Sequence, residues 1–131
     1  MTYNLQRFLD AQDSSYSGYE QALSEIQSGG KSGHWIWYIF PQQKGLGYSY
    51  NSQYYGLDGV EEAKAYIEHP VLGTRLRAIT QALLAHKGQR TIRELMGSGI
   101  DVLKLKTSMT LFDQVSPDDV FAEVLEGFFG Q

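Results

Sequence analysis

The residues best suited to chemistry lie in two segments, residues 29–49 and 101–110. The first segment, GGKSGHWIWYIFPQQKGLGYS, combines a lysine, a histidine, two tryptophans and a glycine-leucine-glycine turn. The second segment, DVLKLKTSMT, carries an acid, a cation and a hydroxyl group at helical spacing. If the two segments meet in space, they line one cleft with convergent polar groups and aromatic walls, as ligand sites do.

Two short motifs in the first segment resemble phosphate-binding and nucleotide-binding loops. GKS at residues 30–32 ends like a phosphate-binding loop, but that motif needs an earlier glycine where Glu25 stands, and a preceding strand. The two glycines before Lys31 are typical of a helix end, although Lys31 can still reach an anion. GLG at residues 45–47 is half of a dinucleotide fingerprint. It is typical of a turn or of a close backbone approach to a ligand.

His34 and Asp101 are the candidate catalytic residues. His34 precedes the tryptophan run and can act as a general acid or base, but a histidine bonded to backbone at a helix start gives the same pattern. Asp101 offers the carboxylate that cleavage of an N-glycosidic bond needs. The three histidines lack metal-ligand spacing and the chain has no cysteine, so neither a metal site nor a cofactor is predicted.

The candidate ligand-binding residues supply cations, aromatic surface, hydrogen-bonding groups and flexible backbone. They are Lys31, Trp35, Trp37, Gln42, Gly45, Gly47, Ser49, Lys104 and Ser108. At least one of the tryptophans is expected in the core, since an indole is the largest apolar group available. Asp101, Lys104 and Ser108 share one helical face, which is typical of a solvated face with a salt bridge as well as of a site.

The elements that must position these residues are helices. Apolar residues recur at helical spacing through most of the chain, which predicts an all-α, compact multihelical single domain over residues 1–131, with six or seven helices and little or no sheet. Asp101 is expected to cap a helix, and Thr91 with Glu94 is expected to form a capping box. Residues 35–40 fit a buried strand or a buried helical turn, and the turn is preferred because a lone strand has no partner. Residues 41–57 are predicted to form an ordered loop.

The overall composition excludes several classes of protein. The chain has 131 residues, 42% of them hydrophobic, and a formal net charge of −4, which argues against a nucleic-acid partner. No apolar run approaches the roughly 20 residues of a membrane span, and the N-terminus does not resemble a signal peptide. A soluble, cytoplasmic protein with no membrane partner is therefore expected.

Several longer motifs together resemble the bacterial family catalogued as domain of unknown function eighteen-ten. They are RFLDAQ (7–12), Y..AL.EI..G (19–29), HWIWYIFPQ (34–42), GLGYS (45–49), EEAKAYIEHPVLGTRLRAI (61–79) and KLKTSMTLF (104–112). The resemblance implies a compact multihelical domain. The chain departs from the family pattern at Thr107, where serine is more usual. It also stops at Gln131, where relatives continue, so a shortened C-terminus is expected.

The resemblance also bears on function. Members of this family resemble, more remotely, a helical superfamily that hydrolyses N-glycosidic bonds in NAD-derived and ADP-ribose-type molecules, but none of its catalytic residues can be placed here. The hypothesis is a cleft, lined by residues 31–49 and 101–110, that binds a nucleotide or ADP-ribose-like ligand, with or without hydrolysis. The alternative is a non-catalytic protein-interaction module that uses the tyrosine-rich loop of residues 48–55. Its protein partner cannot be named from the sequence.

Overall fold

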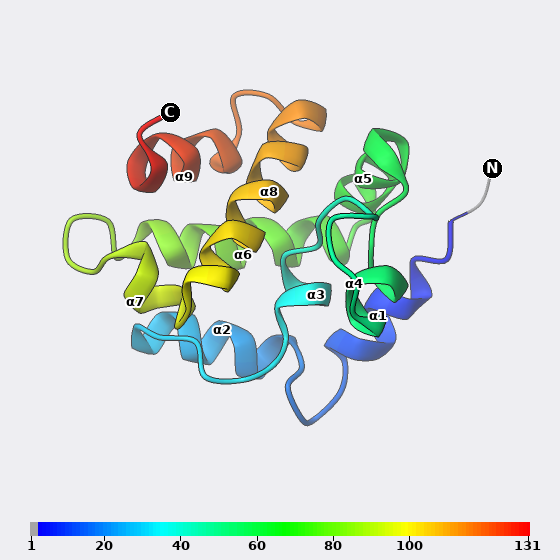
Figure 1. Cartoon of the computed structure of the whole chain (residues 1–131), viewed down its shortest axis with the longest axis horizontal. Coiled ribbons are helices and arrows are strands. Elements are labelled where there is room, and N and C mark those ends of the chain that lie inside the picture. The colour runs from blue at the N-terminus through cyan, green and yellow to red at the C-terminus, as the bar shows by residue number, and fades with distance from the viewer. Residues whose placement is uncertain (1–2) are drawn as a thin grey trace.

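The computed structural model describes residues 3–131, and these fold into nine helices without a sheet (Figure 1). In chain order they are α1 (Gln6–Gln12), α2 (Tyr19–Ser28), α3 (Ile36–Ile39), α4 (Tyr50–Tyr54), α5 (Gly59–Glu68), α6 (Leu72–Leu84), α7 (Ile92–Met96), α8 (Gly99–Val115) and α9 (Val120–Phe129). The strand-like pairing in this part of the chain is one isolated bridge between Gln43 and Leu57. The mainly helical prediction is confirmed, but six or seven helices was too few.

The difference in helix number comes from short helices. Residues 35–40 contain the helical turn α3, as preferred from the sequence. The predicted loop of residues 41–57 contains α4, which begins where the Ser49 hydroxyl accepts a hydrogen bond from the Ser52 backbone N–H at 3.1 Å. A helix of five residues is too short to leave an apolar period in the sequence, so the pattern did not reveal it.

The helix caps agree with prediction at α7 but not at α8. Thr91 and Glu94 form the predicted capping box at the start of α7. Asp101 is not the cap of α8, because this helix already begins at Gly99 and the Ser98 hydroxyl accepts from the Asp101 N–H at 3.2 Å. Asp101 therefore lies in the first turn of α8, and its carboxylate is available to another element.

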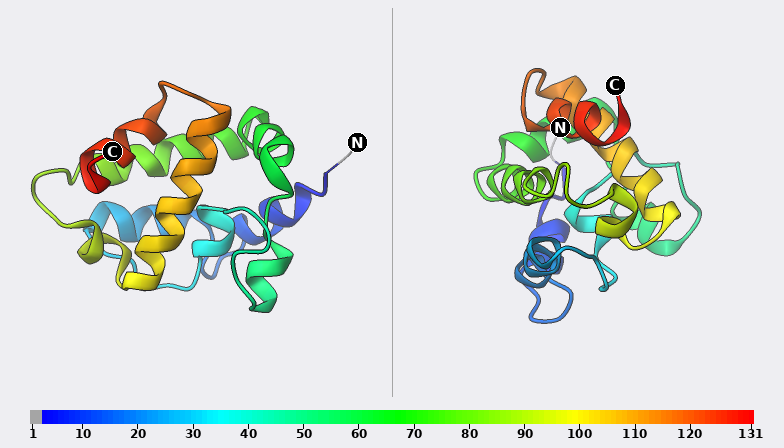
Figure 2. Two further views of the ribbon diagram at one scale, coloured as in Figure 1. Left: turned by 45° about the horizontal axis from the view of Figure 1, so that its top comes forward. Right: turned by 90° about the vertical axis from the view of Figure 1, so that its left-hand side faces the viewer.

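Two long helices, α6 and α8, organise the domain (Figures 1 and 2). Helix α6 packs against α2, α5 and α9, while α8 packs against α3, α5, α7 and α9. The apolar stripe of α6 is buried, and its members are Leu72, Leu76, Ile79 and Leu83. The start of α8 also lies against the segment that precedes α3, where Lys31 contacts Asp101.

The motif HPVLG forms a sharp junction between α5 and α6. The His69 ring accepts hydrogen bonds at Nδ1 from the N–H groups of Val71 and Leu72, at 3.1 and 3.2 Å. A Cβ atom on Gly73 would lie 2.1 Å from the Ile67 carbonyl oxygen, closer than any side chain allows. The histidine caps the new helix and the glycine permits the close approach of the backbones.

A buried ion pair fixes the long loop before α5. The Arg7 guanidinium lies 2.9 Å from the Glu62 carboxylate, and both side chains are buried. Arg7 also donates to the carbonyl oxygens of Tyr54 and Gly56, at 2.9 and 3.1 Å. The second Glu62 oxygen accepts from the Asp58 N–H at 2.7 Å. One ion pair therefore holds α1, α5 and the end of the 41–57 loop together.

We predict that Glu62→Gln destabilises the fold by about 3 kcal/mol, since it leaves the Arg7 charge buried without its partner. The measurement is the free energy of unfolding from urea denaturation. Glu68→Gln, an exposed change on the same helix, is the control and should change stability by less than about 0.5 kcal/mol. Equal effects of the two variants would contradict the role of the ion pair.

Candidate functional site

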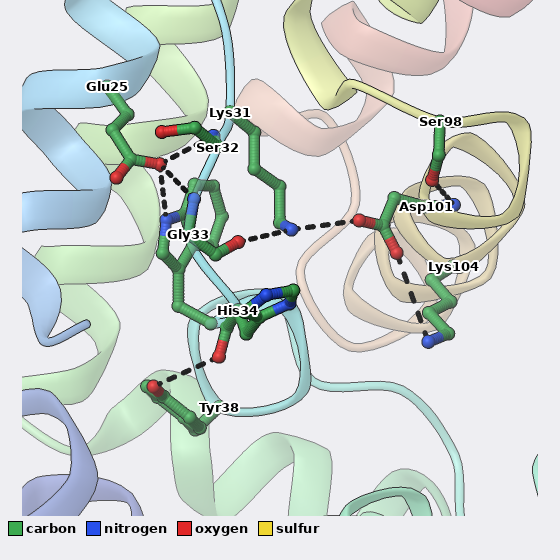
Figure 3. Close-up of polar contacts among 10 residues, drawn as sticks. Glu25, Lys31, Ser32, Gly33, His34, Tyr38, Ser98, Asp101 and Lys104 are labelled. Atoms are coloured by element: carbon green, nitrogen blue, oxygen red, sulfur yellow. Dashed lines mark hydrogen bonds and ion pairs between the residues drawn. The ribbon is translucent and has the colours of Figure 1, made fainter.

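The loop between α2 and α3 takes its shape from the carboxylate of Glu25 (Figure 3). One oxygen, Oε1, accepts hydrogen bonds from the backbone N–H groups of Ser32 and Gly33, both at 2.8 Å, and from the Trp35 indole Nε1 at 2.9 Å. The other oxygen accepts from the Gln21 side chain at 2.9 Å. Four donors on one carboxylate fix the path of the loop and the orientation of the indole.

These donors also determine the pKa of Glu25. Burial acts to raise the pKa, but the hydrogen bonds from Gly33, Ser32, Gln21 and Trp35 favour the charged form and lower it to about 2 from its usual 4.5. The carboxylate therefore stays ionised over the whole range in which the protein is expected to work.

Three charged side chains, those of Lys31, Asp101 and Lys104, meet beside this loop (Figure 3), close to two indole rings. Lys31 Nζ lies 2.9 Å from one oxygen of Asp101, and Lys104 Nζ lies 3.9 Å from the other. Each ammonium group also lies over an indole ring, Lys31 at 5.0 Å from the Trp35 centroid and Lys104 at 4.9 Å from the Trp37 centroid. The Lys31 side chain is only 7% exposed. The cluster joins the 29–35 loop to the first turn of α8.

A cleft of about 350 Å³ opens between this loop and the junction of α7 with α8. We call it the Lys31 cleft. Its lining residues are Lys31, Ser32, Gly33, His34, Ile36, Trp37, Met96, Gly97, Ser98, Ile100 and Asp101. The structure thus brings four predicted site residues together: Lys31, His34, Trp37 and Asp101. The His34 side chain is exposed, and only its backbone carbonyl is hydrogen-bonded, to the Tyr38 hydroxyl at 3.4 Å.

Trp35 does not line the cleft, which corrects the expectation that it contacts a ligand. Its side chain is 0% exposed, and its N–H is already bonded to Glu25. The indole fills the core because that carboxylate supplies the acceptor a buried N–H requires. Of the two tryptophans, only Trp37 reaches the cleft wall.

Three more predicted residues line a separate hollow, so the expected single cleft is divided. Gln42, Gly47 and Lys104 belong to a neighbouring hollow of about 300 Å³. The Thr107 hydroxyl donates to the Gln42 side chain at 2.5 Å and brings the loop against α8. Thr107 keeps the hydroxyl that a serine would supply at this position.

The remaining predicted residues lie outside the hollows described here. Gly45 is exposed with a φ of +94°, so a turn accounts for this glycine. The Ser49 hydroxyl caps α4 and is therefore occupied within the fold. Ser108 is fully buried, because the face of α8 that it shares with Asp101 turns into the core by the third turn. The structure therefore does not bring these three residues together with the others in either hollow.

Sequence reasoning missed Glu25 and Ser98. A buried indole N–H requires an acceptor, so the sequence did indicate that some acceptor must lie near Trp35. It did not indicate that this acceptor is Glu25, which lies ten residues earlier in the chain. Ser98 precedes a glycine and carries a side chain that commonly caps helices, which is a signal the sequence did contain.

Metal-binding and membrane-spanning features are absent from the part of the chain that the structure describes. Residues 3–131 contain no group of three or more histidine, cysteine, aspartate or glutamate side chains arranged to hold a metal ion. No helix within the same residues has both the length and the apolar character required to cross a bilayer.

The fold and the cleft define a small multihelical domain, and comparison with known proteins identifies its family. The family described as Protein of unknown function (DUF1810) matches residues 2–131, so the chain belongs to that family. The chain is also similar to the conserved hypothetical protein Rv1873 from Mycobacterium tuberculosis, a crystal structure 38% identical in sequence. The likeness covers 98% of this chain and 89% of that one, with a TM-score of 0.89. No curated protein matches the chain.

The Glu25 hydrogen bonds predict a specific pH dependence of stability. Because the folded pKa is depressed, the contribution of this carboxylate is fully present above about pH 4.5 and is lost as the pH falls towards 2. We expect Glu25→Gln to be less stable than the unmodified protein by about 1–2 kcal/mol at pH 7, a value reduced for solvent screening. The difference should shrink steadily between pH 4.5 and 2.

The measurement is urea denaturation at a series of pH values. Glu20→Gln, an exposed change at the start of the same helix, should give a small difference that does not follow this profile. A Glu25→Gln difference that is constant from pH 7 to pH 2 would show that the carboxylate does not stabilise the loop through its charge.

Proposed function

We propose that this protein binds a small anionic molecule of the nucleotide or ADP-ribose type in the Lys31 cleft. The observation that carries the proposal is the cluster of Lys31, Asp101 and Lys104 at the start of α8, beside a cleft with an aromatic wall. A volume of about 350 Å³ falls at the lower end of the usual range for ligand pockets. A ligand of the size of one nucleotide therefore fits better than a whole dinucleotide.

The local charge favours an anion. Two lysines flank one aspartate, so the cluster has an excess of one positive charge, while the whole chain carries −4. The start of α8 adds to this field, because the first N–H groups of a helix have no acceptor within it. The Asp101 N–H already donates to the Ser98 hydroxyl, so the N–H groups of Gly99 and Ile100 are the ones that can donate to a bound anion.

The apolar side of the cleft suits a flat ring. Trp37 and the exposed Ile100 supply most of this side, with the buried Ile36 and Met96 behind them, and Ser32 and Ser98 also line the cleft. The Trp37 indole N–H is buried and has no hydrogen-bond partner among residues 3–131. Buried polar groups are nearly always paired. A ligand in the cleft would satisfy this donor if its binding turned the indole, because other atoms cover the N–H in the fold as it stands.

The geometry supports binding better than hydrolysis. Both oxygens of Asp101 face lysine ammonium groups, so the carboxylate can approach a substrate only after an ion pair opens. The His34 imidazole has no group within the described residues to orient it, as a general base usually has. We therefore assign no catalytic step to either residue.

The exposed tyrosines favour a second candidate function. Tyr48 is 95% exposed, and the rings of Tyr50 and Tyr54 stack with centroids 5.6 Å apart. Exposed aromatic side chains of this kind are common at protein interfaces. The alternative is therefore a non-catalytic interaction module that uses residues 48–55. If no small molecule binds, this alternative is favoured.

The first test is thermal melting of the purified protein with NAD, ADP-ribose, nucleotides and nucleosides. A ligand at 100 times its dissociation constant stabilises by about 2.7 kcal/mol, which raises Tm by several degrees in a domain of this size. We expect the shift to disappear in His34→Ala and to fall in Lys104→Ala. Lys64→Ala, an exposed change on α5, is the matched control and should keep the full shift.

A second variant tests the sign of the charge in the cleft. Asp101→Asn removes the one carboxylate of the cluster and should tighten the binding of an anion by roughly three- to tenfold. Isothermal titration with the tightest-binding ligand of the panel measures the change in affinity. The melting temperature of the variant without ligand shows whether it is folded. Weaker binding in Asp101→Asn would contradict an anion site built on the lysines.

A further inference from the structure

Helix α8 presents a second row of apolar side chains that the rest of the described chain leaves uncovered. Ile100 is 68% exposed and Leu103 is 66% exposed, one helical turn apart on the same face. Leu46, from the loop beside α8, is 56% exposed. The opposite face of α8 carries Leu105, Met109 and Phe112 into the core. This helix is therefore apolar on two sides, whereas packing within the domain requires only one.

The exposed face of α8 borders a surface made of adjoining hollows. Two hollows, of about 300 and 270 Å³, share the residues Leu46 and Thr107 and follow α8 from Ile100 to Gln114. We call this surface the α8 groove. Its lining residues are Gln42, Gln43, Leu46, Gly47, Ile100, Leu103, Lys104, Lys106, Thr107, Thr110, Leu111 and Gln114. At 1.5 Å per residue the groove is about 21 Å long, the length of four helical turns.

The charge of the groove differs in sign from that of the protein. Its lining includes Lys104 and Lys106 but no aspartate or glutamate, although the chain carries −4 overall. Lys104 lies 3.9 Å from Asp101 outside the groove, so Lys106 carries most of the unpaired positive charge. Lys106 forms no ion pair within residues 3–131, and its ammonium group lies over the Phe129 ring at 5.8 Å from the centroid. A row of apolar side chains bordered by lysines is complementary to a segment that is apolar on one side and acidic at its edges.

We propose that the α8 groove binds an acidic amphipathic helix of a partner protein. Its apolar side chains would cover Ile100, Leu103 and Leu46, and its carboxylates would pair with Lys104 and Lys106. A helix suits this surface better than an added strand, because the described chain offers a single isolated bridge and no sheet edge to extend. The groove shares Ile100 with the Lys31 cleft, and its Lys104 also belongs to the charge cluster beside that cleft. Leu46, Leu103 and Lys106 belong to the groove alone, so the proposal does not depend on a ligand in the cleft.

The test is a selection of peptides on the immobilised full chain. The displayed library contains helical peptides of about 16 residues, long enough to follow the groove, with leucine at every third or fourth position. The other positions vary among glutamate, aspartate, lysine, arginine, serine and alanine. We expect the selected peptides to be rich in glutamate and aspartate. Their binding should weaken at least tenfold in Leu103→Glu, and this variant should keep the fold because the site is exposed.

A matched pair of charge variants completes the experiment. Lys106→Gln should lower the affinity for the selected peptide severalfold, as measured by fluorescence anisotropy. Added salt should reduce the difference in affinity between wild type and this variant. Lys64→Gln, the same change on α5, should leave the affinity unchanged. His34→Ala, which should abolish ligand binding in the Lys31 cleft, should also leave peptide binding intact.

Three results would overturn the proposal. The first is a selection in which wild type enriches no peptide above the Leu103→Glu variant. The second is enrichment of lysine-rich and arginine-rich peptides. The third is concentration-dependent dimerisation that Leu103→Glu abolishes, because the groove would then be covered by a second copy of the chain.

Discussion

The arrangement of the site depends on one carboxylate, that of Glu25. Its hydrogen bonds to Ser32, Gly33 and Trp35 fix the chain where it leaves α2 and approaches α3. Because the indole of Trp35 is held inward by this carboxylate, the neighbouring side chains of Lys31 and His34 lie on the side of the loop that faces the cleft. A loop rich in glycine and serine thus gains a single conformation without a strand or a long helix to support it.

Helix α8 completes the site from the other side of the cleft. The Ser98 cap begins the helix early enough that Asp101 lies in its first turn and meets Lys31. The preceding residue, Gly97, has a φ of +83°, and a Cβ atom there would lie 2.8 Å from the Lys31 carbonyl oxygen. The close approach of the two backbones therefore requires glycine at this position. The same helix also borders the α8 groove, so one element supports both surfaces.

The fold class could be predicted because long amphipathic helices have a period that the sequence displays. The apolar period of α6 and the capping box of α7 are examples. The roles of His69 and Gly73 in the junction HPVLG became clear only from the structure. Helix α4 could not be predicted, since its five residues depend on the Ser49 cap and on the surrounding loop. Family membership followed from motifs spread over nearly the whole chain.

The candidate site was predicted at the level of segments rather than of individual side chains. The two polar segments do adjoin, but they line two hollows instead of one. The sequence could not show which tryptophan was buried, because that depends on the Glu25 acceptor ten residues earlier in the chain. Long-range pairs such as Lys31 with Asp101 leave no local pattern, so only their residue types pointed to them.

The central claim is that the Lys31 cleft binds a small anion beside Trp37. The most direct measurement is a titration of the ¹⁵N-labelled protein with ADP-ribose and with AMP, followed in ¹H–¹⁵N spectra. We expect the signals of the Trp37 indole and of the Gly99 and Ile100 amides to shift with ligand concentration, while the signal of the Trp35 indole, which Glu25 holds in the core, does not shift. Unchanged spectra, or shifts confined to residues outside the cleft, would contradict it.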